Sequence, residues 1–423
     1  MHILLVHNFY GSSAPSGENR AVLEERDLLR AAGHEVVEYF TYSDAIRDRG
    51  VLPVLGAAMF VPWNSAQRKA LRRLVLEIRP DVMHVHNVFP LLSPAIFGAA
   101  SGVPTAVVNT LHNYRTVCPA SLPLRNGRAC TDCIEARSVR PALRHGCYRN
   151  SRLATLPLAA SVAIHRRAQT YVRYVDAFIA LTNFQRSVLA QGGLPKQHIY
   201  VKPNCYPETP QPVPWDERDD KAVFIGRISA EKGVDTLVEA WRRLGAAAPK
   251  LEIIGDGPEA DRLQRSTANG CRERVIFVGR KAVDETRAHL SRAKLLIVPS
   301  TWFEAFPLVV CEAFAFGVPV AASQFGTFEE IVESPGAGRL FTAGDPANLF
   351  QTIAALWRDQ AGLKQMGRLA YDEFVRKYSA QKNVETLQAI YESALETKRI
   401  RLSCATLERR AGSAELTLRR NDN

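Results

Sequence analysis

Residues 297–322 of this 423-residue chain read IVPSTWFEAFPLVVCEAFAFGVPVAA. The stretch begins with apolar residues typical of a buried strand and continues into a short loop that holds Glu304. Pro307 suits the first position of a helix, where its missing N–H group and fixed φ angle carry no penalty. We therefore expect a helix over 308–316, ended by Gly-Val-Pro at 317–319. The segment predicts a strand–loop–helix unit of an α/β protein.

Two carboxylates flank the start of the expected helix. Glu304 lies just before it and Glu312 about a turn and a half inside it, because six residues of helix rise roughly 9 Å. The N–H groups of the helix start lie between the two acids and favour an anion. A nucleotide-sugar matches this arrangement, because it has hydroxyl-rich groups at both ends and phosphates between them. The alternative is an amphipathic core helix that keeps two acids, although glutamate is rarely buried without a partner.

The spacing of Glu304 and Glu312, with Phe306, Pro307 and Leu308 between them, resembles the signature of the retaining glycosyltransferases of family 4. The resemblance implies the GT-B fold, an α/β architecture of two Rossmann-like parallel-sheet domains that face each other across a cleft. It implies that Glu304 holds the sugar hydroxyls of the donor and that Glu312 holds the ribose. Phe306, Pro307 and Leu308 would line the donor site. It also implies that catalysis needs no metal or other cofactor.

A second motif, GRISAEKG at 226–233, is similar to a motif of the same family. The motif begins at Gly226, and the residues that match Arg227 and Lys232 hold the donor diphosphate in the family. The chemistry agrees, because negative charge grows on the leaving phosphate as the sugar–oxygen bond breaks and fixed cations stabilise it. The turn that contains Gly257 is expected to form part of the nucleotide wall. The alternative is an ordinary turn with a surface Arg and Lys.

Strands and helices alternate along both halves of the chain, which indicates parallel sheets with ligands at the carboxyl ends of the strands. The proline-rich segment 204–220 predicts a stiff linker between an N-terminal, acceptor-side domain over 1–203 and a C-terminal, nucleotide-sugar-binding domain over 221–377. In GT-B enzymes the last helix crosses back onto the first domain, a role that we assign to 378–398. The basic stretch 399–423 lacks an apolar period and is expected to be a disordered tail.

The first domain offers further candidates for the site. The Gly- and Ser-containing loop 7–19 follows a buried strand, a geometry that lets backbone N–H groups meet phosphate, so we expect Gly17 to contact the donor. A simple tight turn is the alternative. In the family a histidine that matches His112 faces the donor sugar near the reacting carbon, and we carry that catalytic role to His112. His86 ends a neighbouring strand and is a candidate for the acceptor side, unless either histidine is only a hydrogen-bonded structural residue.

Four of the eight cysteines lie in a Pro-, Gly- and Arg-rich insertion at about 113–150. Their spacing is C-x11-C-x2-C-x13-C, formed by Cys118, Cys130, Cys133 and Cys147. A set of four thiolates suits a closed tetrahedral zinc site that would fold a segment without a core of its own. An iron–sulfur cluster uses the same ligands, and four unrelated buried thiols are the plain alternative.

With 46% hydrophobic and 23% charged residues, the composition is that of a globular protein. Because no run reaches the ~18 apolar residues of a membrane span and the chain opens as a strand rather than a signal peptide, we expect a cytoplasmic location. The net charge of +11 favours an anionic partner, and the basic residues of an expected helix over 151–174 suggest peripheral contact with the inner face of the cell membrane. No zinc finger, RRM or basic-aromatic platform is recognisable, so nucleic acid is not an expected partner.

These patterns together predict a transferase that moves a hexose, with retention, from a UDP- or GDP-sugar to a hydroxyl of a sugar or lipid-linked acceptor. Synthesis of cell-envelope polysaccharide or glycolipid is the expected setting. The alternatives are a GT-B sugar epimerase or hydrolase, and a non-catalytic GT-B protein that binds partners through a metal-stabilised insertion.

Overall fold

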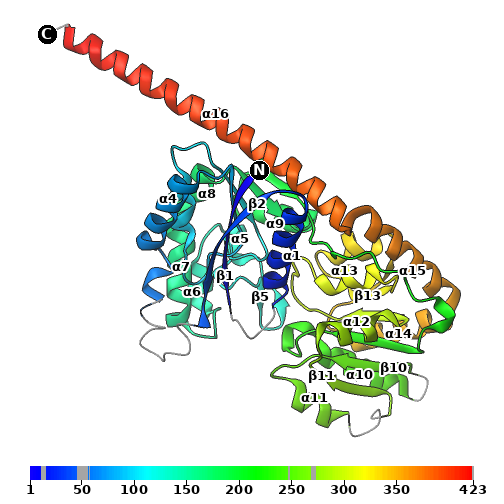
Figure 1. The fold of residues 1–423 in the computed structure, drawn as a ribbon. Helices are drawn as coiled ribbons and strands as arrows, with labels where there is room; N and C mark the ends of the chain where they lie inside the picture. The colour runs from blue at the N-terminus through cyan, green and yellow to red at the C-terminus, as the bar shows by residue number, and fades with distance from the viewer. Residues whose placement is uncertain (11–15, 45–55, 57, 246–247, 268–272, 422–423) are drawn as a thin grey trace.

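A computed structural model describes residues 1–10, 16–44, 56, 58–245, 248–267 and 273–421. The chain forms two α/β lobes, each built on a six-stranded sheet, and a long C-terminal helix lies along both lobes (Figure 1). Every strand pair in these two sheets is parallel. The predicted architecture of two parallel-sheet domains is therefore confirmed.

The N-terminal sheet places its first strand between the second and third. From one edge to the other the strands are β2 (Glu35–Tyr42), β1 (His2–Phe9), β3 (Val82–Val85), β4 (Ala106–Thr110), β7 (Ala177–Ala180) and β8 (Ile199–Val201). The central strands β3, β4 and β7 are buried along their whole length, because elements packed on both faces cover them. The carboxyl ends of β3 and β4 lead directly into the loops that carry the predicted histidines, His86 and His112.

Helices and short turns cover both faces of this sheet. They are α1 (Gly17–Ala31), α4 (Ser65–Ile78), α7 (Arg152–Arg167), α8 (Thr170–Tyr174), α9 (Asn183–Gln191) and the 3-10 turns η1 (Pro94–Ala100) and η2 (Lys196–His198). The sequence predicts one continuous helix over 151–174, which is wrong. Gln169 has a φ of 51°, a left-handed conformation that breaks the helical hydrogen-bond ladder between α7 and α8.

The C-terminal sheet repeats the same design. Its strands, in spatial order, are β11 (Val275–Gly279), β10 (Lys250–Ile254), β9 (Lys221–Ile225), β12 (Leu295–Val298), β13 (Val320–Ser323) and β14 (Gly338–Phe341). The helices are α10 (Val234–Leu244), α11 (Ala260–Ser266), α12 (Val283–Ser291), α13 (Leu308–Ala315), α14 (Pro346–Arg358) and α15 (Gln360–Glu373), with 3-10 turns η3 (Trp215–Glu217) and η4 (Ala230–Lys232) and π turns η6 (Glu329–Glu333) and η7 (Phe374–Tyr378). The segment that joins the two sheets, 202–220, contains η3 and no other helix or strand, apart from a single bridge between Tyr206 and Ser379.

The cysteine-containing insertion folds into small elements of its own. They are an antiparallel hairpin of β5 (Leu124–Arg125) and β6 (Arg128–Ala129), followed by the short helices α5 (Asp132–Glu135) and α6 (Arg140–His145). The insertion leaves the sheet after β4 and returns at α7, so it grows directly out of the loop that begins with His112.

The last helix, α16 (Ala380–Asn421), begins against the C-terminal lobe and runs across the N-terminal one (Figure 1). The sequence predicts a disordered tail over 399–423, which is wrong for its described part, because α16 continues to Asn421. The tail sequence contains no proline and is rich in Leu, Arg, Ala and Glu, which extend an established helix at little free-energy cost. Arg401 also holds the helix against the N-terminal lobe, because its guanidinium donates hydrogen bonds to the carbonyls of Val172, Arg173 and Val175.

Candidate functional site

The GRISAEKG turn of the C-terminal lobe is built by close backbone approaches that require glycine. A Cβ atom on Gly257 would lie 2.3 Å from the carbonyl oxygen of Ile228, and one on Gly255 would lie 1.9 Å from that of Gly226. These turns therefore stack directly on each other at the carboxyl ends of β9 and β10. Arg227 projects from the stack and is exposed, and its guanidinium makes no hydrogen bond or ion pair with the described residues. Its backbone carbonyl accepts a hydrogen bond from the N–H of Ser229 at 3.1 Å.

Lys232 and Glu304 meet where the loops after β9 and β12 come together. The Lys232 ammonium nitrogen lies 2.5 Å from Oε1 of Glu304, and the Ser300 hydroxyl donates to the same oxygen at 2.8 Å. Glu304 is 5% exposed, and the Trp302 ring lies 5.5 Å from the Lys232 nitrogen. Two residues that lie 72 positions apart in the sequence, each predicted from its own motif, are thus brought into direct contact.

Glu312 faces the other lobe. Its carboxylate accepts a hydrogen bond from the guanidinium of Arg20 on α1, and Arg20 also donates to Glu24 at 2.7 Å. Near this ion pair, a Cβ on Gly17 would lie only 3.2 Å from the Leu308 side chain, so the start of α1 packs against the start of α13. Sequence reasoning missed Arg20, and only its position one turn after Gly17 could have drawn attention to it.

Phe306, Pro307 and Leu308, which lie between the two acids, differ in burial and in their contacts. Pro307 caps α13 with an extended ψ of 106° and is not its first helical residue, so that expectation is wrong. Phe306 is 8% exposed, with its ring centroid 5.6 Å from that of Tyr378. Because the Phe306 ring packs in the hydrophobic core, its side chain supports the site from the core side. Leu308 is partly exposed and faces α1.

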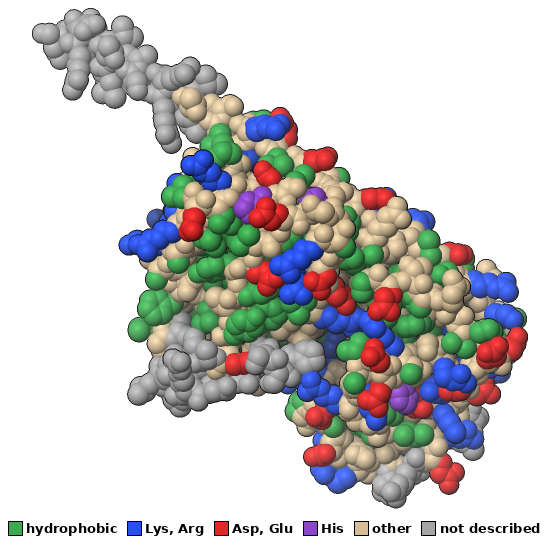
Figure 2. All heavy atoms as spheres, in the orientation of Figure 1, with side chains coloured by type: hydrophobic (Ala, Val, Ile, Leu, Met, Phe, Trp, Pro, Cys, Tyr) green, Lys and Arg blue, Asp and Glu red, His purple; other side chains and the backbone are tan. Residues whose placement is uncertain are grey.

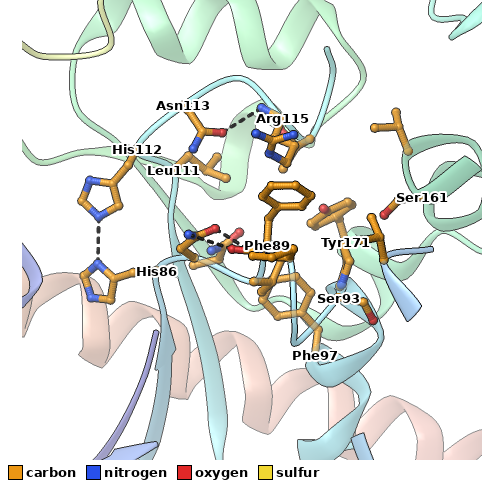
Figure 3. A pocket seen from close by; sticks show the side chains of 18 of the residues that line it. His86, Phe89, Ser93, Phe97, Leu111, His112, Asn113, Arg115, Ser161 and Tyr171 are labelled. Carbon is orange, nitrogen blue, oxygen red and sulfur yellow. Dashed lines mark hydrogen bonds between the residues drawn. The ribbon is translucent and has the colours of Figure 1, made fainter. Parts of the chain in front are cut away.

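His112 and His86 form a pair at the carboxyl edge of the N-terminal sheet. Nε2 of His112 lies 2.9 Å from Nδ1 of His86, and both rings line a pocket whose opposite side carries the aromatic rings of Phe89, Phe97 and Tyr171 (Figure 3). The guanidinium of Arg115 lies 4.0 Å from the centre of the Phe89 ring at the edge of this pocket. The pocket is therefore apolar along one side and polar where it meets the two histidines.

The loop after His112 approaches the C-terminal lobe. Burial raises the pKa of Tyr114, and the nearby Glu304 carboxylate raises it further, which places this loop of the first lobe close to the donor-side acid of the second. Glu330 of η6 accepts hydrogen bonds from the backbone N–H groups of Asn183 and Phe184 at the start of α9. The lobes therefore touch at several points around the predicted residues, and Figure 2 shows a notch between them with Lys and Arg side chains on its rim.

The four clustered cysteines also come together in space. Cys118, Cys130, Cys133 and Cys147 line one small pocket within the insertion, and all four are free thiols. Burial raises the pKa of Cys133 to about 11, and the neighbouring thiols of Cys147 and Cys130 act in the same direction. Cys205, Cys311 and Cys404 lie elsewhere, and Cys271 is outside the described residues.

Two family models match adjacent parts of the chain. The model for glycosyltransferase family 4 matches residues 15–208, and the model for glycosyl transferases group 1 matches residues 206–373. The boundary between them falls in the segment that joins the two sheets. Among the described helices none is both long enough and apolar enough to cross a membrane.

Characterised proteins and solved structures agree with these matches. A phosphatidyl-myo-inositol mannosyltransferase of Mycobacterium leprae is 23% identical over 395 residues, which cover 91% of this chain and 95% of that protein. An N-acetyl-alpha-D-glucosaminyl L-malate synthase of Bacillus anthracis is 22% identical over 79% of this chain and 81% of its own length. The structure of Anabaena HepE in complex with UDP superposes with a TM-score of 0.63 at 18% identity, covering 93% of this chain and all of that one. A glycosyltransferase from Rickettsia africae gives a TM-score of 0.65 at 14% identity, covering 93% of this chain and 98% of that one. The chain therefore belongs to the glycosyltransferases of family 4, enzymes with the GT-B fold.

Proposed function

We propose that this enzyme transfers a hexose, with retention of anomeric configuration, from a nucleotide diphosphate sugar to an acceptor hydroxyl. The observation that carries the proposal is the ion pair between Lys232 and Glu304. The cation comes from one predicted donor motif and the acid from the other. Glu312 lies at the far end of the segment that begins with Glu304 and supplies the acid expected for the ribose. Anabaena HepE has been crystallised with UDP and with UDP-glucose, which supports a UDP-sugar among the donors to be tested.

In this proposal Arg227 and Lys232 hold the donor diphosphate. Negative charge develops on the leaving phosphate as the sugar–oxygen bond breaks, and cations already fixed at that position stabilise it without reorganisation. Lys232 then exchanges part of its contact with Glu304 for phosphate, while Glu304 turns its free lone pairs to the sugar hydroxyls. Hydrogen bonds to charged groups contribute about 1.5–3 kcal/mol each, so losing either cation should slow transfer at least about tenfold.

His112 completes the donor site from the first lobe. We assign its imidazole to a hydroxyl of the transferred sugar, near the reacting carbon. Among the described residues around Glu304 and His112 we identify no side chain with the role of a covalent nucleophile, so we favour displacement on the same face of the sugar, assisted by the leaving phosphate. Approach of the two lobes would exclude water from the reacting atoms.

The acceptor is proposed to be a sugar or lipid-linked hydroxyl compound of the cell envelope. The outer face of α7 exposes Leu153 and Leu156 at 83% and 54%, next to Arg152, and the helix ends with the basic residues Arg166 and Arg167. Exposed apolar side chains beside cations suit the surface of an anionic bilayer, where each basic residue contributes roughly 1 kcal/mol. Co-sedimentation with phosphatidylglycerol vesicles tests this, and binding that survives Leu153→Asp with Leu156→Asp would contradict it.

The proposed reaction is tested by incubating the full chain with UDP-, GDP- and ADP-sugars, first by thermal shift and then with candidate acceptors. Glu304→Ala should abolish transfer while nucleoside diphosphate still binds, since the diphosphate contacts lie on Arg227 and Lys232. Unchanged turnover would reject the role given to Glu304. Release of free sugar or of an epimer without any acceptor would indicate a hydrolase or epimerase instead.

We further propose that the four clustered cysteines hold a structural zinc ion, with no part in catalysis. Their common pocket and their place in a segment of very short elements support this, because zinc folds such segments by replacing a hydrophobic core. The only described group with three candidate ligand atoms all within 4.8 Å of one another is Glu25, His84 and His86, so zinc would have to draw the thiols closer. Native mass spectrometry should find one zinc ion that is lost in Cys130→Ser with Cys133→Ser and retained in Cys404→Ser. An iron–sulfur cluster would show instead as visible absorbance.

A further inference from the structure

The start of α9 contacts the loop that carries His112. Residues 182–185, which we call the 182–185 turn, form the N-cap and first turn of this helix of the N-terminal lobe. The side-chain amide of Gln185 donates to the carbonyl of Leu111 at 2.7 Å, and Leu111 directly precedes His112. Gln185 is fully buried, so this hydrogen bond is closed to water. The turn therefore holds the beginning of the His112 loop.

The same turn contacts the C-terminal lobe on both sides of Glu304. The hydroxyl of Thr182 donates to the carbonyl of Ala305 at 3.4 Å. The ring of Phe184 packs against the ring of Phe303, with 4.9 Å between their centroids. Because Phe303 and Ala305 are the chain neighbours of Glu304, both contacts bear directly on the position of this acid.

A carboxylate of the C-terminal lobe caps the helix that makes these contacts. Oε1 of Glu330 accepts hydrogen bonds from the backbone N–H of Asn183 at 3.1 Å and from its side-chain amide at 2.9 Å, while Oε2 accepts from the N–H of Phe184 at 3.1 Å. The first N–H groups of a helix have no partner within the helix, and the helix dipole favours a negative charge beside them. The third N–H, that of Gln185, is capped by Thr182 within the first lobe. The cap of α9 is therefore built from both lobes.

The second lobe offers Phe184 a closely fitted seat. The Phe303 ring stacks on the ring of Phe325, with 4.7 Å between their centroids. Gly326 has a φ of 61°, and a Cβ atom on it would lie 3.0 Å from the rings of both Phe184 and Phe303. Glycine thus serves both the backbone conformation and the close approach of the rings. A contact this close passes any shift of Phe184 to the residue before Glu304.

We propose that the 182–185 turn sets the distance between His112 and Glu304. Gln185 is the positioning residue on the His112 side, and Phe184 is the positioning residue on the Glu304 side. His112 and Glu304 come from different lobes, so their separation depends on contacts between the lobes, and one turn of helix contacts the chain neighbours of both. The consequence for catalysis rests on the proposed function, because a misplacement of roughly 1 Å between groups that act on one substrate can slow a reaction about a hundredfold.

Hydrogen exchange followed by mass spectrometry tests the coupling in the free protein. Glu330→Ala removes a partly exposed side chain of the C-terminal lobe, so the variant should fold. The amides of 111–116, in the other lobe, should then exchange about tenfold faster, because the turn behind Gln185 has lost its dock. Phe184→Ala, a change in the N-terminal lobe, should speed exchange at 301–306 in the C-terminal lobe by a similar factor.

Kinetics measure the consequence for transfer. In both variants kcat should fall about ten- to a hundredfold. The Kd for UDP should stay within about twofold, since the proposed diphosphate contacts, Arg227 and Lys232, both lie on the second lobe. Glu330→Gln keeps one accepting oxygen and should give an intermediate kcat. The matched control is Glu329→Ala, which removes the exposed carboxylate of the preceding residue in η6 and should leave exchange and kcat unchanged.

Faster exchange confined to the amides of Asn183 and Phe184 in Glu330→Ala would overturn the inference, because it would show an ordinary helix cap without coupling between the loops. An unchanged kcat in an active enzyme, or an equal response of Glu329→Ala, would also overturn it. Hydrogen exchange needs no donor, so it decides the coupling even if no nucleotide-sugar is turned over, a result that would reject the transferase proposal alone.

Discussion

At the scale of single residues, each acid of the donor site has at least one hydrogen-bond partner from a distant part of the chain. Glu304 receives a hydrogen bond from the fully buried hydroxyl of Ser300 as well as from Lys232. Glu312 is engaged by Arg20 from the other lobe. A carboxylate with fixed donors keeps one orientation, so these partners set the direction in which its remaining lone pairs point.

Ser300→Ala should therefore lower kcat/KM about tenfold, because it removes a hydrogen bond to a charged group worth about 1.5–3 kcal/mol in a buried site. The Kd for nucleoside diphosphate should be nearly unchanged. Ser323→Ala is the matched control, since Ser323 is also fully buried but its hydroxyl oxygen has no hydrogen-bond partner among the described residues. Steady-state kinetics and titration calorimetry separate the two effects, and an equal loss in both variants would contradict the role of Ser300.

At the scale of elements, the helix that carries Glu312 is ended by a residue of the connecting segment. Arg218, 8% exposed, donates to the carbonyl oxygens of Phe316 and Gly317, both at 2.9 Å, just beyond the end of α13. It also donates to the carbonyl of Val213 at 3.0 Å. Burial lowers the pKa of Arg218 to about 10, so the guanidinium remains charged at neutral pH. A cation at a helix C-terminus is stabilising, and here it also fastens the connecting segment to the second lobe.

Arg218→Met should destabilise the C-terminal lobe by about 2–3 kcal/mol, because it leaves buried carbonyl groups without donors. The expected fall in Tm is roughly 5–10 °C for a lobe of this size. Arg292→Met serves for comparison, since Arg292 binds Glu217 and Asp219 at the surface and its side chain is 51% exposed. A surface pair contributes at most about 1 kcal/mol. Calorimetric scans in which both variants melt together would show that Arg218 has no special role.

At the scale of the whole molecule, α16 completes the first lobe with residues from the other end of the chain. Leu387, Ile390, Tyr391 and Ala394 are each at most 3% exposed and pack in one cluster with strands of the N-terminal sheet. Lys398 donates to the carbonyl of Ala100 at 3.0 Å. The N-terminal lobe is therefore not complete until the last helix has been made.

Ile390→Ala should destabilise the protein by about 2–5 kcal/mol, the range for deleting a buried aliphatic side chain. Ile400→Ala, ten residues later on the same helix, should change stability by less than about 0.5 kcal/mol, because Ile400 is 56% exposed. Urea denaturation followed by circular dichroism measures both. Equal midpoints for the two variants would mean that α16 does not contribute to the core of the first lobe.

Much of the fold was predictable because its signals are local. Alternating strands and helices identified two parallel sheets, and the helix expected over 308–316 is present as α13 (Leu308–Ala315). Errors arose where local preference was not decisive. The break at Gln169 and the helix beyond residue 398 depend on neighbours, such as the carbonyls that bind Arg401, that no local pattern shows.

What the sequence by itself determined is the chemistry available: two acids at fixed spacing, a glycine-bounded turn with an arginine and a lysine, a histidine after a strand, and four clustered thiols. Only the tertiary structure decided which of them meet. It paired Lys232 with Glu304, set Arg20 against Glu312 and placed the start of α9 against the loops that carry His112 and Glu304. The physical reason is that a motif is written in consecutive residues, whereas an ion pair between distant segments depends on how sheets and helices pack, which no short stretch encodes.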